Sequence, residues 1–519
     1  MSRPALFAAL FAGAAVISGF TILQGGAPFD EGIVLQAARR VAGGQVVYRD
    51  FDWAYGPAQP YLLGAWFEAF GPSLLVWRVV RVLCDAAIAV VVYSLVRREG
   101  SHRLALAAWL AAACAMAQPY SATPTAPALV FTLLALAVVT RDGPAKRAMP
   151  TAALLVAVAA AWRIDFGVYA GAAVAVALAL RSGPRAVRAR AVAVFAALAA
   201  ALTLLAYLPL LIAVGPLDAY AAILGDSLGE RDYWTLPFPV SYDGPLSVWP
   251  PGEAAGDAKD LLDFYVPLLL AVGLAVAALA AILDHRRAGN EAPLAPWAFL
   301  ALAGGSLTYL LSRVDEFHGA PLAVALAVAL PVLARRLRCH DRAPALAIAA
   351  VSVLALLVAN GVANRGSALL SPPELSTIDL PAADGTKAPP GEARALERMA
   401  RNVQRVAQPD QPIYTITRRS DLVRVNQPLV YVFADRDNPT GIDYGLQTSA
   451  ADQRRLVRRL RAVEPAAIVR WLDPASVVRE PNLRGEPSGS RLLDEWVAGA
   501  YRPEARFGDY EVLVPRRGR

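Results

Sequence analysis

The sequence predicts a polytopic α-helical membrane protein that ends in a small α/β domain outside the membrane. Of its 519 residues, 56% are hydrophobic and 18% are charged, whereas soluble proteins are about 45–50% apolar and about one quarter charged. The apolar stretches crowd into residues 5–363, and residues 364–519 have the composition of an ordinary soluble segment. These observations exclude a purely soluble enzyme, a disordered protein and a single-span anchored domain.

About eleven apolar segments are candidate membrane-spanning helices. Such a helix needs about 20 mainly apolar residues to cross the ~30 Å hydrocarbon core. Alanine dominates these segments, and small residues permit close packing of helices in lipid. The expected spans lie near residues 5–23, 75–96, 103–118, 125–140, 148–162, 166–180, 191–214, 262–283, 295–312, 319–334 and 343–363.

Basic residues gather in every second connection between these spans. Loops 119–124 and 163–165, on the opposite side, hold one arginine between them. By the positive-inside rule the basic side, with the N-terminus, is cytoplasmic, and the first segment is a retained span rather than a signal peptide. The basic residues are Arg97, Arg98, Arg103, Arg141, Lys146, Arg147, Arg181, Arg185, Arg188, Arg190, Arg286, Arg287, Arg335, Arg336, Arg338 and Arg342.

An odd number of spans places the C-terminus outside the cytoplasm. The expected organisation is a transmembrane domain over 1–363 with outer loops 24–74 and 215–261, a linker over 364–391, and an α/β domain over 392–519. In the tail, helices are expected at Gly391–Ala407, Ala450–Val463 and Ser490–Tyr501, and strands at Pro412–Thr417, Leu429–Phe433, Ala466–Trp471 and Tyr510–Val514.

Charge and cysteine content indicate no nucleic-acid partner and no structural metal. The net charge of +7 is explained by arginines that set orientation in the membrane. The three cysteines have neither disulfide-framework nor zinc-ligand spacing. No Gly-rich nucleotide-binding loop follows a strand, so a reaction on the outer side must use an activated substrate delivered within the bilayer.

The first outer loop carries the most informative polar residues. Asp30 and Glu31 begin an amphipathic stretch that Gly43 and Gly44 end, as expected for a helix on the membrane surface; a second apolar-faced helix runs through Phe70. Asp30 is either the N-cap of the first helix or a general base that takes a proton from a hydroxyl nucleophile. The two roles are compatible, since a capping carboxylate is also held rigidly.

Two further charged clusters lie at outer span ends, and a third lies within the second span. Arg163 and Asp165 form one outer cluster, and Arg313, Asp315 and His318 form the other. Each is either a local ion pair at the interface or a phosphate-binding site, for which arginine is well suited. Within the second span, Arg78, Arg81 and Asp85 share one face, and the Arg81–Asp85 pair is expected to fix helix packing. The aromatics and carboxylates of loop 215–261 suit a sugar-facing loop or an interfacial belt.

These features together resemble the GT-C glycosyltransferases. The stretch from Asp30-Glu31-Gly through Gly44-Gln-Val-Val-Tyr48-Arg-Asp50 to Tyr55-Gly-Pro57 is similar to the first loop of the bacterial branch related to protein O-mannosyltransferases and lipid A aminoarabinose transferases. Arg163-Ile-Asp165-Phe-Gly167, Arg313-Val-Asp315-Glu-Phe-His318 and the tail stretch from Asn426 to Thr440 are similar as well.

The resemblance implies transfer of a sugar from a polyprenyl-phosphate donor to a glycan, lipid or protein hydroxyl at the outer face of a bacterial plasma membrane. It implies that Asp30 is the base and that Glu31 orients it or helps to bind a divalent metal. Arg163, Arg313 and His318 would neutralise the departing lipid phosphate, and Tyr55, Asp165 and Asp315 would complete the substrate site.

Two other classes of protein remain open at this point. A lipid or glycan transporter or flippase predicts inverted repeats and broken helices with charges at mid-membrane, whereas the charges here cluster at outer span ends. A non-catalytic envelope scaffold predicts that Asp30 is dispensable.

Overall fold

The computed structural model covers the whole chain. It describes residues 2–118, 121, 123–141, 145–225, 242–288, 294–314, 316–336, 343–423, 426–443, 449–478 and 489–516. Asp315 of the second outer cluster and residues 226–241 of the second long loop lie outside the described residues.

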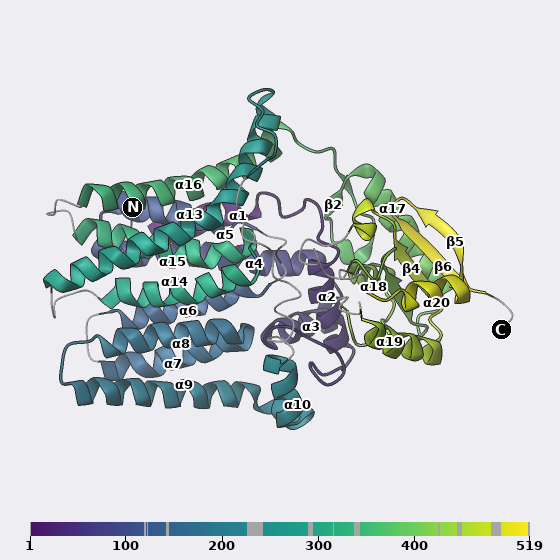
Figure 1. Cartoon of the computed structure of the whole chain (residues 1–519), viewed down its shortest axis with the longest axis horizontal. Coiled ribbons are helices and arrows are strands. Elements are labelled where there is room, and N and C mark those ends of the chain that lie inside the picture. Colours follow the sequence, from purple (N-terminus) through teal and green to yellow (C-terminus); the bar gives the residue numbers. More distant parts are fainter. Residues whose placement is uncertain are drawn as a thin grey trace.

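Each of the eleven expected apolar segments contains a helix, and these helices lie side by side in one bundle (Figure 1). Six of them, α4, α9, α13, α14, α15 and α16, are long and apolar enough to cross a membrane, so the chain is a membrane protein. That all eleven cross it stays a prediction. The bundle helices are α1 (Arg3–Gly19), α4 (Leu74–Glu99), α5 (His102–Met116), α6 (Thr125–Val139), α7 (Ala145–Trp162), α8 (Ile164–Ala179), α9 (Arg185–Val214), α13 (Pro251–Ala288), α14 (Leu294–Ser312), α15 (Glu316–Arg336) and α16 (Ala343–Leu370).

Helix α15 forms the centre of the bundle and α9 forms its rim. In the most apolar stretch of α15, 89% of the residues are buried, against 17% in α9. Small residues permit close packing between the helices of the bundle. Gly305 of α14 lies against the ring of Tyr169, and Gly361 of α16 lies against Cys114 of α5. Apolar side chains on α9, such as Leu204 and Ile212, are exposed, as expected for a helix that faces lipid.

Two short helices lie between the bundle and the tail (Figure 1). They are α2 (Asp30–Ala42) and α3 (Ala58–Phe70), and Gly43 ends α2 as expected. The expectation that Asp30 caps α2 is wrong: Phe29 occupies the N-cap position, and Asp30 is the first helical residue. A carboxylate in the first turn still interacts favourably with the helix dipole. A further short helix, α10 (Pro216–Tyr220), continues into the π-helical turn η1 (Ala221–Gly225) after α9.

The tail contains a four-stranded sheet with helices packed around it. The strand order is β3-β4-β6-β5, with β3 parallel to β4 and the other pairs antiparallel. A separate two-stranded ladder pairs β1 with β2. The elements are β1 (Ser376–Thr377), η3 (Pro381–Ala383), β2 (Lys387–Ala388), α17 (Pro390–Val406), β3 (Ile413–Ile416), α18 (Leu429–Ala434), α19 (Ala450–Val463), β4 (Ala467–Trp471), η4 (Pro474–Val477), α20 (Leu492–Ala500), β5 (Tyr501–Phe507) and β6 (Tyr510–Pro515).

Two expectations about the tail are corrected. The apolar run Leu429–Phe433, expected as a strand, is the buried helix α18, because a short continuous apolar run fits either structure. Strand β5 was not expected; it is a mostly exposed edge strand containing Pro503, a position where proline is tolerated.

The tail docks directly on the first long loop, residues 24–74. Leu429 N donates to Pro28 O at 3.1 Å, Lys387 N to Leu23 O at 2.7 Å, and Asp52 N to Gly441 O at 3.0 Å. Helix α18 passes so close to α2 that a Cβ at Gly32 would collide with the backbone nitrogen of Leu429. Segments about 400 residues apart in the sequence therefore form one packed unit.

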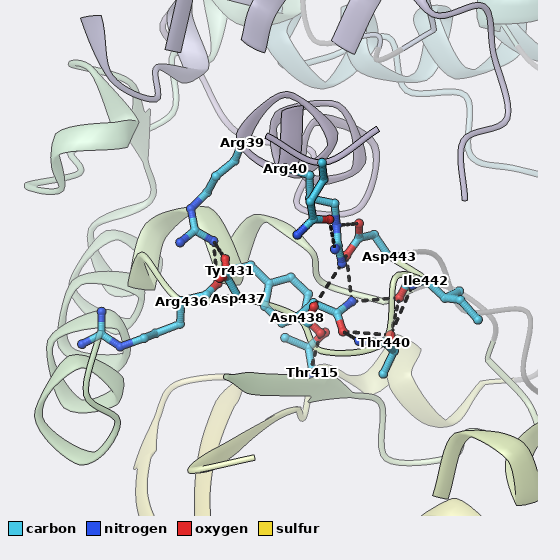
Figure 2. A network of polar contacts seen from close by, with 11 residues as sticks. Arg39, Arg40, Thr415, Tyr431, Arg436, Asp437, Asn438, Thr440, Ile442 and Asp443 are labelled. Atoms are coloured by element: carbon cyan, nitrogen blue, oxygen red, sulfur yellow. Dashed lines mark hydrogen bonds and ion pairs between the residues drawn. The ribbon is translucent and has the colours of Figure 1, made fainter. Parts of the chain in front are cut away.

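Two consecutive arginines of α2 reach into the tail (Figure 2). Arg40 Nε and Nη2 lie 2.7 and 3.1 Å from the two oxygens of Asp443, and Nη2 also donates to Asn438 O at 3.2 Å. The Arg40 and Asp443 side chains are 5% and 3% exposed. Arg39 instead pairs with Asp435 and Asp437, whose side chains are more than 70% exposed.

The buried pair should stabilise the docked tail far more than the exposed pairs. Asp443→Ala leaves Arg40 buried without a countercharge, and we expect it to cost about 3–5 kcal/mol. The matched change Asp437→Ala removes an exposed partner of Arg39 and should cost about 0–1 kcal/mol. Thermal unfolding and limited proteolysis of each purified variant in detergent measure its loss of stability. Equal losses in the two variants would contradict the assignment of Arg40–Asp443 as the main contact.

Candidate functional site

The two consecutive carboxylates of the first loop have different surroundings. Glu31 is fully buried, and Arg78 of α4 donates to its two oxygens from Nε at 2.6 Å and from Nη2 at 2.8 Å. Ala27 N also donates to Glu31 at 2.9 Å. Glu31 is therefore a structural anchor with both oxygens occupied.

Arg78 joins this anchor to the loop that follows α1. It donates to Ile22 O at 2.7 Å and to Gly25 O at 2.9 Å. The guanidinium group thus holds the loop, the start of α2 and the helix α4 together. The sequence analysis placed Arg78 only on a helix face shared with Arg81 and Asp85; Arg81 and Asp85 do pair with each other, at 3.7 Å.

Asp30 is exposed, in contrast to its neighbour. Consecutive side chains of an α-helix point about 100° apart, so the inward anchoring of Glu31 turns Asp30 away from the core. The Asp30 carboxylate lies near Tyr55, whose pKa its charge helps to raise. The structure thus leaves one of the two expected carboxylates accessible.

Tyr55 is held in place by a close approach of the first loop to the end of α7. Gly56 N donates to Trp162 O at 3.1 Å, and a Cβ at Gly56 would collide with the carbonyl of Ala161. Tyr48 donates from its hydroxyl to the carbonyl of Tyr55. Burial raises the pKa of Tyr55; Arg163 opposes this shift, and Asp30 and Asp165 add to it. Tyr55 is therefore a neutral phenol near pH 7.

Arg163 is the centre of a polar cluster. Its Nε and Nη2 lie 3.0 and 2.7 Å from the two oxygens of Asp165, and its Nη1 donates to Thr125 Oγ1 and Tyr309 Oη, both at 3.1 Å. Its guanidinium carbon lies 5.1 Å from the ring centre of Tyr55 and 4.5 Å from that of Tyr309, within the range of cation–π attraction. Asp165 thus balances the charge of Arg163 directly.

Tyr309 joins the cluster of Arg313 and His318 to the cluster around Arg163. The ring centroids of Tyr309 and His318 lie 4.3 Å apart. Arg313 is half-buried at the end of α14, one helical turn beyond Tyr309, and Asp315 lies outside the described residues. The sequence analysis missed Tyr309 and Thr125. Tyr309 lies four residues before Arg313, on the same helix face, and this spacing is the one signal that could have indicated Tyr309.

The described residues do not fit the divalent metal that the resemblance allows. Among them, no group of three or more His, Cys, Asp or Glu could hold a metal ion. Both oxygens of Glu31 accept hydrogen bonds from a guanidinium group, whose positive charge would oppose a bound cation.

The arrangement can bind a polar substrate beside an accessible carboxylate. Asp30, the neutral phenol of Tyr55 and the cluster of Arg163, Tyr309 and His318 lie close together. Asp30 begins α2, the helix that lies between the bundle and the tail (Figure 1). A carboxylate can accept a proton, while phenols and guanidinium groups donate hydrogen bonds to oxygen atoms.

Comparison with known proteins identifies the fold. No family model matches the chain, and no curated protein matches its sequence. The crystal structure of ArnT from Cupriavidus metallidurans in the apo state is similar at a TM-score of 0.57, with 14% identity over 99% of this chain and 98% of that chain. The structure of ArnT bound to undecaprenyl phosphate is similar at 0.54, with the same identity and coverage.

A third similar structure comes from an archaeon. The oligosaccharyltransferase of Archaeoglobus fulgidus in the apo form has a TM-score of 0.52, with 13% identity over 90% of this chain and 70% of that chain. The chain therefore shares the fold of ArnT and of this oligosaccharyltransferase.

The contrast between the two carboxylates leads to a stability test. Glu31→Gln leaves the Arg78 guanidinium buried without a countercharge, and we expect it to cost about 3–5 kcal/mol. Asp30→Asn changes an exposed group and should alter stability by about 0.5 kcal/mol or less. Apparent unfolding temperatures of the two purified variants in detergent check this, and a Glu31→Gln variant as stable as the parent would contradict the anchoring role.

Proposed function

We propose that the chain is a glycosyltransferase that moves a sugar from a polyprenyl-phosphate donor to a hydroxyl group of an envelope glycan, lipid or protein. The observation that carries this proposal is the accessible Asp30 beside a rigidly anchored Glu31 at one end of a GT-C bundle. A lipid-phosphate donor is supported by the similar ArnT structure that is bound to undecaprenyl phosphate.

In this proposal Asp30 is the general base. It takes the proton of the acceptor hydroxyl as that oxygen attacks the anomeric carbon of the sugar. The bond between the anomeric carbon and the phosphate oxygen breaks, and its electron pair leaves with the polyprenyl phosphate. Removal of the proton as the bond forms lowers the barrier because it prevents positive charge on the attacking oxygen.

The cluster around Arg163 serves the sugar and the leaving group. Arg163, Arg313 and His318 supply positive charge or hydrogen bonds as negative charge develops on the phosphate. Since Asp165 already pairs with Arg163, we assign Arg163 the further role of holding Tyr55 and Tyr309 in place. Tyr55 donates a hydrogen bond from its hydroxyl group to the substrate, and Asp315 is the last of the proposed substrate-binding residues.

The proposed location is the outer face of a bacterial plasma membrane. The distribution of arginines puts the N-terminus in the cytoplasm and the tail, with loops 24–74 and 215–261, on the other side. The GxxxxGK[ST] and GxGxxG nucleotide-binding patterns do not follow a strand in the sequence. A donor that is carried by a lipid is consistent with a site outside the cytoplasm and with the lack of these nucleotide-binding patterns.

The activity test uses Asp30. In a deletion strain that expresses Asp30→Asn, we expect transfer to fall by at least about 100-fold, the lower range for loss of a general base, at normal protein level and membrane insertion. Analysis of lipid-linked sugars and envelope glycans measures transfer and also identifies the donor and the acceptor. Asp437→Asn, an exposed tail change, is the control; near-parental transfer by Asp30→Asn would overturn the assignment of the base.

A further inference from the structure

Helix α19 of the tail has a strongly basic exposed face. Its 14 residues, Ala450–Val463, contain five arginines and a single acidic residue, Asp452. All five arginines are exposed, and at about 100° per residue they occupy one arc of about 160° around the helix. We call this surface the arginine face. Its residues are Arg454, Arg455, Arg458, Arg459 and Arg461.

The apolar side of α19 is buried inside the tail. Leu456, Val457 and Leu460 are buried and pack in one cluster with side chains of β3, β4 and α20. Gln453 on the same side is fully buried; it donates to Ser420 Oγ and accepts from Leu493 N, both at 3.0 Å. These contacts fix the orientation of α19, so the arginine face is turned to the solvent.

Arginines elsewhere in the tail have acidic partners. On the arginine face, Arg455 pairs with Asp452. Among the residues that the structure describes, no carboxylate oxygen lies within 4.0 Å of Arg454, Arg458 or Arg461. The face therefore has more positive charge than its own surroundings balance. The pairs in the rest of the tail include Arg401–Asp379, Arg405–Glu504, Arg419–Asp421 and Arg470–Glu511.

The spacing of these arginines weakens the helix. Arg454 and Arg458 are four residues apart, as are Arg455 and Arg459, and Arg461 follows Arg458 by three. Like charges at these spacings repel each other and destabilise a helix. Negative groups placed along the face would remove this repulsion, and a guanidinium group binds a carboxylate or a phosphate through two parallel hydrogen bonds.

The arginine face adjoins the contact between the tail and α2. Arg459 Nε donates to Pro439 O at 2.9 Å, and the preceding residue, Asn438, accepts a hydrogen bond from Arg40 Nη2 at 3.2 Å (Figure 2). Arg40 and Asp30 lie near opposite ends of α2, about 15 Å apart along its axis. A molecule that contacts both Asp30 and the arginine face must therefore be extended, as a glycan chain is.

We propose that the arginine face binds an anionic glycan chain, whose carboxylate or phosphate groups contact Arg454, Arg458 and Arg461. The proposal rests on the proposed function, because it names the class of the acceptor. Charged units of the chain lie on α19, while a hydroxyl group at the end of the chain reaches Asp30.

A glycan fits this face better than a lipid surface does. A helix that lies in a membrane interface inserts an apolar side between the lipids, whereas the apolar side of α19 packs inside the tail. Helices α2 and α3 also lie between the bundle and the tail that carries α19 (Figure 1).

Three dextrans of equal length test which chemical group is bound. Neutral dextran, carboxymethyl-dextran and dextran phosphate are titrated against the full-length protein in detergent at about 0.15 M salt, which screens charges more than about 8 Å apart. We expect at least one charged dextran to bind about tenfold or more tighter than neutral dextran, and the tighter of the two identifies the anionic group. Equal affinities for all three, or no binding, would overturn the proposal.

A triple variant tests whether α19 is the binding surface. Arg454→Gln, Arg458→Gln and Arg461→Gln together should weaken binding of the charged dextran by about tenfold or more. The matched control makes the same change in net charge at other exposed arginines, and its affinity should stay within about twofold of the parent. Equal losses in the two variants would show attraction to the net charge alone and would overturn the proposal. The control changes are Arg401→Gln, Arg405→Gln and Arg502→Gln.

Folding of the triple variant is checked by its apparent unfolding temperature. Because the three substitutions remove like-charge repulsion within α19, we expect this temperature to equal or exceed that of the parent. A second triple variant with lysine at the same three positions keeps the charge but loses the planar donor group of arginine. It should bind with an affinity between those of the parent and the glutamine variant, and binding weaker than that of the glutamine variant would contradict the account.

Competitors separate a glycan from other anionic partners. Mixed micelles that contain phosphatidylglycerol stand for a membrane surface, and polyglutamate stands for an acidic protein. Neither should displace the charged dextran at the same concentration of negative charge. Displacement by the micelles would favour a lipid surface and displacement by polyglutamate an acidic protein, and either would overturn the assignment of a glycan.

Failure of this proposal is distinguishable from failure of the proposed function. Dextran binding requires no turnover, whereas Asp30→Asn reports transfer. Loss of transfer in Asp30→Asn together with no binding of charged dextran by the parent would overturn the glycan surface alone. Binding to the arginine face with full transfer in Asp30→Asn would overturn the catalytic base and leave the glycan surface in place.

Discussion

The buried ion pair between Glu31 and Arg78 is the interaction on which the candidate site depends. An unpaired charge in this position would be very costly, so the pair restricts α2 to one orientation relative to α4. Asp30 is exposed because its neighbour is anchored. The same guanidinium binds carbonyl groups of the loop after α1, which joins the loop, α2 and the bundle into one rigid unit.

The tail contributes to the same unit from the opposite side of α2. Arg40 reaches Asp443, and Gly32 permits close contact with α18, so α2 is clamped between α4 of the bundle and the tail (Figures 1 and 2). This arrangement explains why the tail, in which no catalytic signature stands out, is part of the functional unit: it holds the helix that presents Asp30.

The apolar runs were sufficient to predict the helices of the bundle, and the stretch from Asp30 to Gly43 was sufficient to predict a short helix there. Local patterns could not show that Glu31 faces Arg78, because the partners are 47 residues apart and their contact depends on tertiary packing. Local patterns also could not show that Tyr309 and Thr125 contact Arg163, because these contacts depend on tertiary packing as well. Leu429–Phe433 was assigned the wrong structure because its apolar run has no periodicity, and its burial between α2 and α17 selects the helix.

The central claim is that Asp30 acts as a base in a single displacement at the anomeric carbon. The configuration of that carbon in donor and product, determined by NMR spectroscopy, tests this claim most directly. Direct attack by the acceptor hydroxyl predicts inversion of the anomeric configuration. Retention would require either a covalent sugar–enzyme intermediate, in which the carboxylate is a nucleophile, or attack from the side of the leaving group, and either would contradict the account.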